Sequence, residues 1–477
     1  MDEIWRWSAT EVARAVAQRE ISSREAVEAS LTRLDQVEPL INAFGDLADG
    51  ALDRADAADA AVARGDRLGP LHGVPIGLKE SHAVAGRTTL LGVPAFAGMA
   101  AESESCPPAS RLFEAGAIEI GRTRMPPGGF RWSTESETSG ITRNPWDPTV
   151  TAGGSSGGAA AAVATGVVPL VLGNDIGGSI RYPASVCGVV GLRPTVGKVP
   201  TSSEGIGARL STREFFAEGP LARHIDDLRL ALSVLAQHDP RDPTATPSAT
   251  AERVSHPRIG VVLDPGAFPF AAKSQPEVDV AVRAAADRLA AEGYDVVEVD
   301  APMLGEAASL WWKLVMPDLD GMGFGAQIDQ FAGAGMSTKW HNMLNLVRDA
   351  YGDTTLPEYL DGYAQRALLR RELSLLMQEY PVLLVAGSGE PPFTLGDDIA
   401  SPERTHELMC HQWPNLAVPA LGLPAVGLAT QPRPGKAPLG VQLIGRAFAE
   451  ETVLDVAEVL HAGSGITTPV DPRPLPE

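Results

Sequence analysis

Two clusters of glycine and serine carry the residues best suited to covalent chemistry. The first, residues 153–158, reads GGSSGG and contains Ser155 and Ser156. The second, residues 173–181, reads GNDIGGSIR and contains Ser179. Because glycine has no Cβ, backbone N–H groups in such a segment can approach a ligand, and consecutive N–H groups can bind an oxyanion. A serine beside these donors can act as a nucleophile or relay a proton, so the clusters predict acyl-transfer chemistry.

A serine nucleophile needs a base, and Lys79 is one candidate. It directly follows an apolar stretch, residues 73–78, that is typical of a buried strand. Burial disfavours the charged form of a lysine, and a neutral amine can accept a proton from a hydroxyl. A serine–lysine system with Lys79 as its base is therefore one of the chemistries that the sequence allows.

Other interpretations of the same segment fit less well. Residues 153–157 match GxSxG, so an α/β-hydrolase would use Ser155 with a later acid and histidine, but the late histidines have no distinguishing context. A P-loop is excluded because residues 191–198 have one residue too many and Val199 replaces the serine or threonine. A flexible glycine–serine linker is disfavoured because residues 159–173, which join the clusters, form an apolar run suited to a core.

The sequence resembles the amidase signature family in several segments. The two serine clusters, together with residues 187–195 (CGVVGLRPT), match the family pattern in register. Residues 73–80 (GVPIGLKE) resemble its lysine strand, and residues 440–446 (GVQLIGR) are similar to its closing strand. Recognisable motifs extend over almost the whole chain, and residues 304–400 differ most from the family.

The resemblance implies a triad of two serines and a lysine. Ser179 would be the nucleophile that becomes acylated, and Ser155, after a cis Gly154–Ser155 peptide bond, would link it to the general base Lys79. The resemblance also implies an oxyanion hole made by the backbone N–H groups of Ile176, Gly177, Gly178 and Ser179. Ser156, Asp175 and Arg181 would hold the two loops together.

Three positions depart from the family pattern. Asn174 stands where threonine is commoner, and His82 occupies a position that is usually apolar. We expect His82 to be a satisfied or exposed histidine rather than a catalytic one. Residues 126–130 (PPGGF) replace a run that faces the acyl group in the family, so Gly129 is expected to line the substrate pocket with unusual room.

The elements that position these residues predict an α/β fold. Residues 259–263, 279–292 and 294–299 have the patterns of strand, helix and strand, which favours parallel pairing. Residues 382–386 and 440–444 are typical of buried strands. The resemblance implies a single α/β/α domain over residues 1–477 with a large mixed sheet flanked by helices, a signature core at about 70–230 and a variable region at about 304–400. Large aromatic and methionine side chains in residues 304–343 predict either plain packing or a cap suited to an aryl or bulky acyl group.

We therefore expect a hydrolase that cleaves the C–N bond of a small amide-like substrate through an acyl-enzyme. Primary amides, anilides, hydrazides, lactams and esters all fit, and no metal or organic cofactor is expected. Three alternatives differ in class: the amidase-like subunit of a tRNA-dependent amidotransferase, an esterase of the α/β-hydrolase type using Ser155, and a non-catalytic binding protein, which the retained lysine and serines argue against.

Composition limits the partners. The 477 residues carry a formal net charge of −21, which disfavours binding to nucleic acid or to anionic membranes through charge. The three cysteines are widely spaced, and the acidic start of the sequence does not resemble a secretory signal. These features predict a cytoplasmic protein without a membrane span. Members of the family that the sequence resembles often form dimers, so the resemblance implies a homodimer.

Overall fold

The strands form one large sheet through the middle of the molecule. The computed structural model describes residues 3–202 and 209–475, so the predicted domain at 1–477 includes a few residues outside this range. In spatial order the sheet contains β1 (Phe44–Leu47), β3 (Ile118–Thr123), β2 (Pro75–Lys79), β6 (Leu170–Asp175), β8 (Ala217–Ala222), β7 (Val190–Arg193), β12 (Ala425–Gln431), β13 (Leu439–Gly445), β11 (Val382–Ala386), β9 (Ile259–Val261) and β10 (Val296–Glu298). A separate short hairpin joins β4 (Glu135–Ser136) to β5 (Gly140–Ile141).

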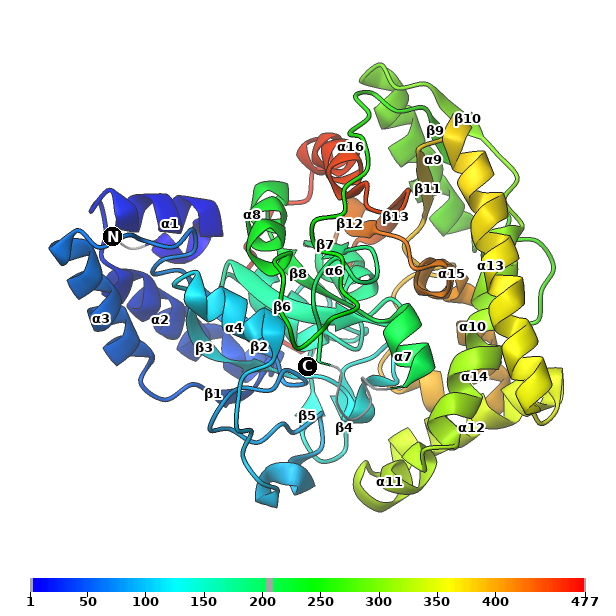
Figure 1. Ribbon diagram of the computed structural model, residues 1–477, viewed down its shortest axis with the longest axis horizontal. Helices are drawn as coiled ribbons and strands as arrows, with labels where there is room; N and C mark the ends of the chain where they lie inside the picture. Colours follow the sequence, from blue (N-terminus) through cyan, green and yellow to red (C-terminus); the bar gives the residue numbers. More distant parts are fainter. Residues whose placement is uncertain (1–2, 203–208, 476–477) are drawn as a thin grey trace.

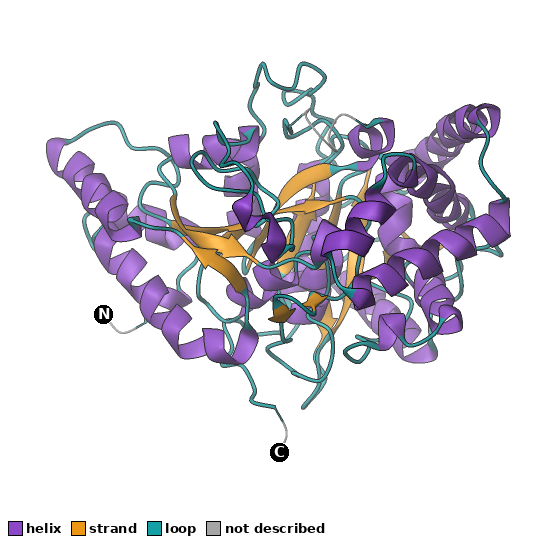
Figure 2. Ribbon diagram, turned by 90° about the horizontal axis from the view of Figure 1, so that it is seen from below, coloured by secondary structure: helices purple, strands orange, loops and turns teal. Residues whose placement is uncertain are grey.

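Helices surround this sheet (Figure 2). They are α1 (Ala9–Ala17), α2 (Ser23–Ile41), α3 (Ala51–Arg64), α4 (Pro107–Glu114), α5 (Gly157–Ala164), α6 (Arg181–Cys187), α7 (Leu210–Phe215), α8 (Ile225–Leu235), α9 (Pro276–Ala291), α10 (Met303–Asp320), α11 (Phe324–Phe331), α12 (Ala334–Tyr351), α13 (Leu356–Glu379), α14 (Pro402–His411), α15 (Trp413–Leu421) and α16 (Glu450–Ala462). Helices α10 to α13 lie together on the side of the molecule away from α1 to α3 (Figure 1). The predicted fold class, a large mixed sheet flanked by helices, is confirmed.

The sheet contains two groups of parallel strands that are separated by antiparallel pairs. Strands β3, β2 and β6 pair in parallel, and so do β11, β9 and β10. Between these groups, the pairs formed by β6, β8, β7, β12, β13 and β11 are antiparallel. The strands of residues 259–386 therefore extend the same sheet that contains the signature segments.

Two hydrophobic cores cover the two faces of the sheet. One contains residues 159–164 of α5 and side chains of α10, α12 and α15, and the other contains side chains of α4, α8, α9 and α16. Successive side chains of a strand point to opposite faces. Because Ile76 and Leu78 of β2 belong to the second core, Lys79 points towards the face that carries α5 and α6.

Within the residues that the structure describes, no helix combines the length and apolar character needed to cross a lipid bilayer.

Candidate active site

Lys79 lies at the end of β2 and is fully buried. Its Nζ lies 2.7 Å from Oγ of Ser155 and donates to Oδ1 of Asn174 at 2.8 Å. The amide oxygen of Asn174 can only accept, whereas a serine hydroxyl can donate or accept. A neutral Lys79 can therefore keep one N–H on Asn174 and turn its lone pair towards the hydroxyl of Ser155.

The surroundings of Lys79 favour this neutral form. Burial lowers the pKa of the amine from 10.5 to about 7, although the carboxylates of Glu218, Asp175 and Glu80 act in the opposite direction. Burial penalises the charged amine because it removes the water that would solvate it. Lys79 therefore titrates near neutral pH.

Ser155 lies two residues before the start of α5, after a cis Gly154–Ser155 peptide bond. Gly129 lies beside it, since a Cβ built at Gly129 would be 3.5 Å from Oγ of Ser155. Gly129 also has a φ of +80°, which glycine adopts without strain. Gly129, the loop residue expected in the substrate pocket, thus lies next to Ser155.

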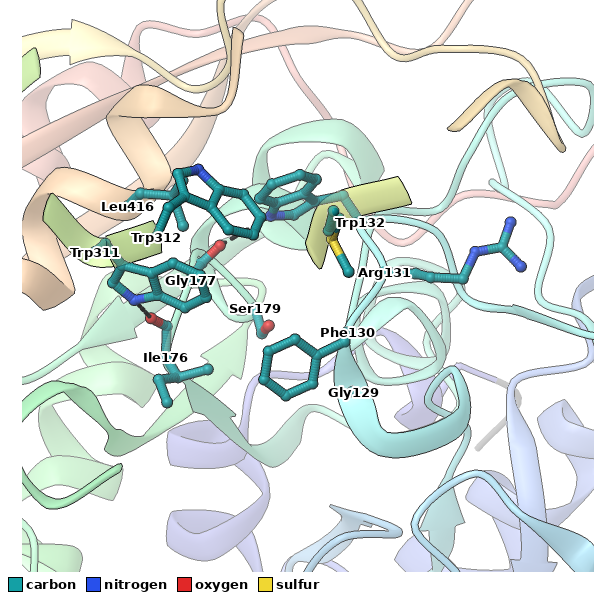
Figure 3. Close-up of a pocket in the computed structure, with 11 residues that line it drawn as sticks. Gly129, Phe130, Arg131, Trp132, Ile176, Gly177, Ser179, Trp311, Trp312 and Leu416 are labelled. Atoms are coloured by element: carbon teal, nitrogen blue, oxygen red, sulfur yellow. Dashed lines mark hydrogen bonds between the residues drawn. The ribbon is translucent and has the colours of Figure 1, made fainter. Parts of the chain in front are cut away.

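Ser179 lies between β6 and α6 and faces a cavity (Figure 3). Gly129 borders the same cavity, so this space connects Ser179 with the surroundings of Ser155. Among the described residues, no hydrogen bond joins the two serine hydroxyls. Catalytic hydrogen bonds often tighten only when substrate binds.

The loop between Asp175 and Ser179 presents backbone N–H groups near this cavity. The N–H groups of Ile176, Gly177 and Ser179 donate to no protein acceptor within the described part of the chain. Gly178 differs from the expectation, because its N–H donates to Oδ1 of Asp175 at 2.9 Å. Gly178 has a φ of +97°, and a Cβ there would lie 2.5 Å from Asn415, so the loop requires glycine at this point.

Asp175 anchors the loop through a buried ion network. Its carboxylate accepts from Nε of Arg181 at 3.0 Å and from Nη2 of Arg181 at 2.9 Å, and it lies 3.6 Å from Arg193. Burial alone would raise the pKa of Asp175, but the charges of Arg181 and Arg193 lower it to about 2. Arg181 also donates to the carbonyl of Asn415 at 2.8 Å, which ties the loop to α15. Asp175 and Arg181 thus hold this loop to its neighbours.

The other sequence-predicted residues have varied surroundings. Oγ of Ser156, expected to help hold the two loops together, is buried without a hydrogen-bond partner among the described residues. His82 is buried and satisfied, with Nδ1 3.0 Å from the carbonyl of Lys79 and Nε2 2.7 Å from Glu218. Asn174, whose role the sequence left open, also donates to Ser81 at 2.7 Å. Glu218, which lies beside His82, was not singled out by the sequence.

The cavity beside Ser179 is mainly apolar and aromatic. Its lining consists of Gly129, Phe130, Arg131, Trp132, Ile176, Gly177, Ser179, Trp311, Trp312, Met343 and Leu416. The guanidinium group of Arg131 points away from the cavity (Figure 3). It donates to Asp398 at 2.7 Å. The lining therefore suits an uncharged, flat group.

The aromatic and methionine side chains of residues 304–343 divide between the two uses that the sequence allows. Trp311 and Trp312 of α10 and Met343 of α12 line the cavity. Met316 and Trp340 belong to the same hydrophobic core as these three residues but do not line the cavity. The variable region thus supplies one wall of the candidate site.

Neither a hydrolase triad with histidine nor a metal centre is found at this site. Oγ of Ser155 is hydrogen-bonded to Nζ of Lys79. Two of the late histidines have other partners: Nε2 of His406 lies 3.1 Å from the carbonyl of Pro269, and Nδ1 of His411 lies 2.9 Å from Glu390. Within the described ranges, no group of three or more histidine, cysteine, aspartate or glutamate side chains is arranged to hold a metal ion. The geometry does not support the α/β-hydrolase interpretation.

Comparison with known proteins gives consistent results over nearly the whole chain. The Amidase family model matches residues 25–454. An indoleacetamide hydrolase from Bradyrhizobium diazoefficiens is 37% identical over 470 residues, which cover 97% of this chain and 87% of that protein. A glutamyl-tRNA(Gln) amidotransferase subunit from Chloroflexus aurantiacus is 34% identical, with 96% of each chain covered.

The solved structure of a bacterial aryl acylamidase is similar in fold, with a TM-score of 0.81, 26% identity and 96% of each chain covered. That protein is described as a member of the amidase signature enzymes. The sequence match and the large mixed sheet agree with this description. The chain belongs to the amidase signature family, and it is a hydrolase of amide C–N bonds.

Proposed function

We propose that this enzyme hydrolyses amides of aromatic, uncharged acyl groups through an acyl-enzyme on Ser179. The contact that carries the proposal is the 2.7 Å hydrogen bond between buried Lys79 and Ser155, beside a cavity that Ser179 faces. A neutral amine linked to a hydroxyl forms the beginning of a proton relay. The aromatic lining supports the acyl specificity.

The reaction then proceeds in two halves. Ser179 rotates towards Ser155, gives its proton to that hydroxyl and attacks the carbonyl carbon, while Ser155 gives its own proton to Lys79. The new C–O bond leaves negative charge on the substrate oxygen, which the N–H groups of Ile176, Gly177 and Ser179 stabilise. The intermediate collapses as the C–N bond breaks, and the leaving nitrogen takes the proton back through the relay. Water attacks the acyl-enzyme along the same path and frees Ser179.

The relatives indicate two possible functions, and the lining of the cavity favours one of them. The indoleacetamide hydrolase is named for an aromatic amide, whereas the amidotransferase subunit is named for work on glutamyl-tRNA. Glutamine, the amide donor expected for such an amidotransferase, carries an ammonium and a carboxylate group. The cavity presents no charged side chain to pair with them, because Arg131 points away from it. We therefore favour the aromatic amide.

A substrate panel tests the proposal on the purified single chain. Release of ammonia is measured from indoleacetamide, phenylacetamide, acetamide and glutamine, and release of the same aryl acid is measured from the matching hydrazide and ester. We expect kcat/KM for the arylacetamides to exceed that for acetamide by roughly a hundredfold or more, because burial of an aromatic group contributes several kcal/mol. Equal rates for acetamide, or glutamine hydrolysis that appears only with added partner chains, would contradict the proposal.

A further inference from the structure

Two tryptophans hold consecutive carbonyl groups of the loop that leads to Ser179. The indole Nε1 of Trp311 donates to the carbonyl of Ile176 at 2.7 Å, and that of Trp132 donates to the carbonyl of Gly177 at 2.9 Å (Figure 3). Trp311 is only 3% exposed and Trp132 only 7%. A buried carbonyl that lost such a donor would be left without a partner, so these contacts constrain the loop strongly.

Each of these bonds fixes the direction of the next N–H group. A trans peptide unit is planar, so its N–H points opposite to its C=O. The bond from Trp311 therefore orients the N–H of Gly177, which has no protein acceptor among the described residues. The bond from Trp132 orients the N–H of Gly178, which Asp175 already holds. Of the two tryptophans, Trp311 alone controls a donor that is available for substrate.

Trp311 also touches the loop through its ring. A Cβ built at Gly177 would lie 3.5 Å from Cζ2 of Trp311, so the indole packs directly against the backbone of Gly177. The same ring forms part of the cavity wall beside Ser179. One side chain of the variable region thus contacts both the cavity beside Ser179 and the peptide unit whose N–H has no protein acceptor among the described residues.

We propose that Trp311 is a positioning residue that aims the N–H of Gly177 at the oxyanion while its ring forms a wall for the acyl group. This inference rests on the proposed function, since it assigns a residue to the oxyanion hole of that same reaction. An acyl group packed on the ring stabilises the indole in the orientation that keeps this donor in place. Binding of the acyl group and stabilisation of the oxyanion are thereby coupled through one side chain.

The neighbouring Trp312 provides a matched control. It lines the same cavity and packs edge-on against Trp311, with ring centroids 4.9 Å apart and an interplanar angle of 85°. Its Nε1 is buried without a hydrogen-bond partner among the described residues. Trp312→Phe therefore removes the same atoms from the same wall without removing a hydrogen bond to the loop.

The experiment compares Trp311→Phe with Trp312→Phe in the full chain. For each variant we measure kcat and KM for phenylacetamide, the affinity for phenylacetaldehyde, which forms a tetrahedral adduct with a serine, and the affinity for the product phenylacetate. We expect Trp311→Phe to lower kcat and the affinity for the aldehyde by about 10- to 100-fold, because one misaligned oxyanion donor affects only the charged tetrahedral state. KM and the affinity for phenylacetate should stay within about threefold for Trp311→Phe. Trp312→Phe changes only the cavity wall, so its affinities for the aldehyde and for phenylacetate should change by the same factor, and its kcat should fall less than that of Trp311→Phe.

The inference is overturned if Trp311→Phe loses no more kcat than Trp312→Phe, or if its affinity for phenylacetate falls as far as its affinity for the aldehyde. If Trp311→Phe does not fold, replacement of Trp311 by benzothienylalanine keeps the bicyclic shape and removes only the N–H donor, and the same results are expected. Failure of the proposed function gives a different result, because the wild-type chain itself would then hydrolyse no arylacetamide.

Discussion

The amine of Lys79 must be neutral to accept a proton, and its burial provides this condition near neutral pH. With a pKa of about 7, the amine is protonated in acid and becomes a base as the pH rises. We therefore expect kcat/KM for phenylacetamide to increase with pH through about 7 and to level off above it. A rate profile measured between about pH 5 and about pH 9 checks this expectation.

A control separates Lys79 from other groups that titrate in the same range. Burial also raises the pKa of the neighbouring Glu80 to about 7. Glu80→Gln should keep the rise in rate, whereas Lys79→Met should remove most of the activity at every pH. A rise that disappears in Glu80→Gln would assign the profile to the carboxyl group and contradict the role of Lys79.

Single residues also mark the limit of what the sequence predicts. Lys79, Ser155 and Ser179 stand in dense local motifs, so their types and spacing were enough to single them out. Trp311 is different, because its bond to Ile176 spans 135 positions and depends on how α10 packs on the loop. The sequence predicted only that its region is rich in large side chains. Contacts of this range follow from the tertiary structure and leave no local pattern.

Among the elements, the loop between β6 and α6 depends on the ion network around Asp175. The carboxylate is fully buried and compensates the charges of Arg181 and Arg193, which are also fully buried. We expect Asp175→Asn to lower the free energy of unfolding by about 3–5 kcal/mol, because it leaves buried guanidinium charges without a carboxylate. Denaturant unfolding followed by circular dichroism gives this value.

The exposed pair of Arg24 and Asp56 is the matched control, with a distance of 2.7 Å and both side chains about half exposed. Asp56→Asn should change the free energy of unfolding far less than Asp175→Asn does, because water screens this pair. The pKa of Asp175 is lowered in the fold to about 2, so its contribution is present above its usual pKa of 3.8 and is lost as the pH falls through about 2. Equal losses in the two variants would contradict the anchoring role.

Strands were easier to predict than the way they pair. Residues 382–386 were predicted as a buried strand from five consecutive apolar residues, and β11 has these bounds. The sequence did not indicate that β11 pairs in parallel with β9 and antiparallel with β13. Both faces of β11 are buried, so its side chains do not distinguish one neighbour from another.

For the whole molecule, we propose that the chain folds as one domain. The polar loop at residues 239–256 divides the chain, but β7, which precedes it, pairs with β12, which follows it, in the same sheet. Separating the two parts would expose hydrogen-bonding strand edges and both hydrophobic cores. We therefore expect one unfolding transition, with the same midpoint by circular dichroism and by tryptophan fluorescence. Two separate transitions would contradict this proposal.

The central claim is that Ser179 is the nucleophile and Ser155 the relay, and mapping a covalent adduct tests it most directly. No lysine or arginine lies between Arg143 and Arg181, so trypsin leaves both serines on one peptide, whereas cleavage before Asp175 separates them. After reaction with an aryl fluorophosphonate, mass spectrometry should find the adduct on the fragment with Ser179 in the wild type and in no fragment of Ser179→Ala. An adduct on the fragment with Ser155 would contradict the account.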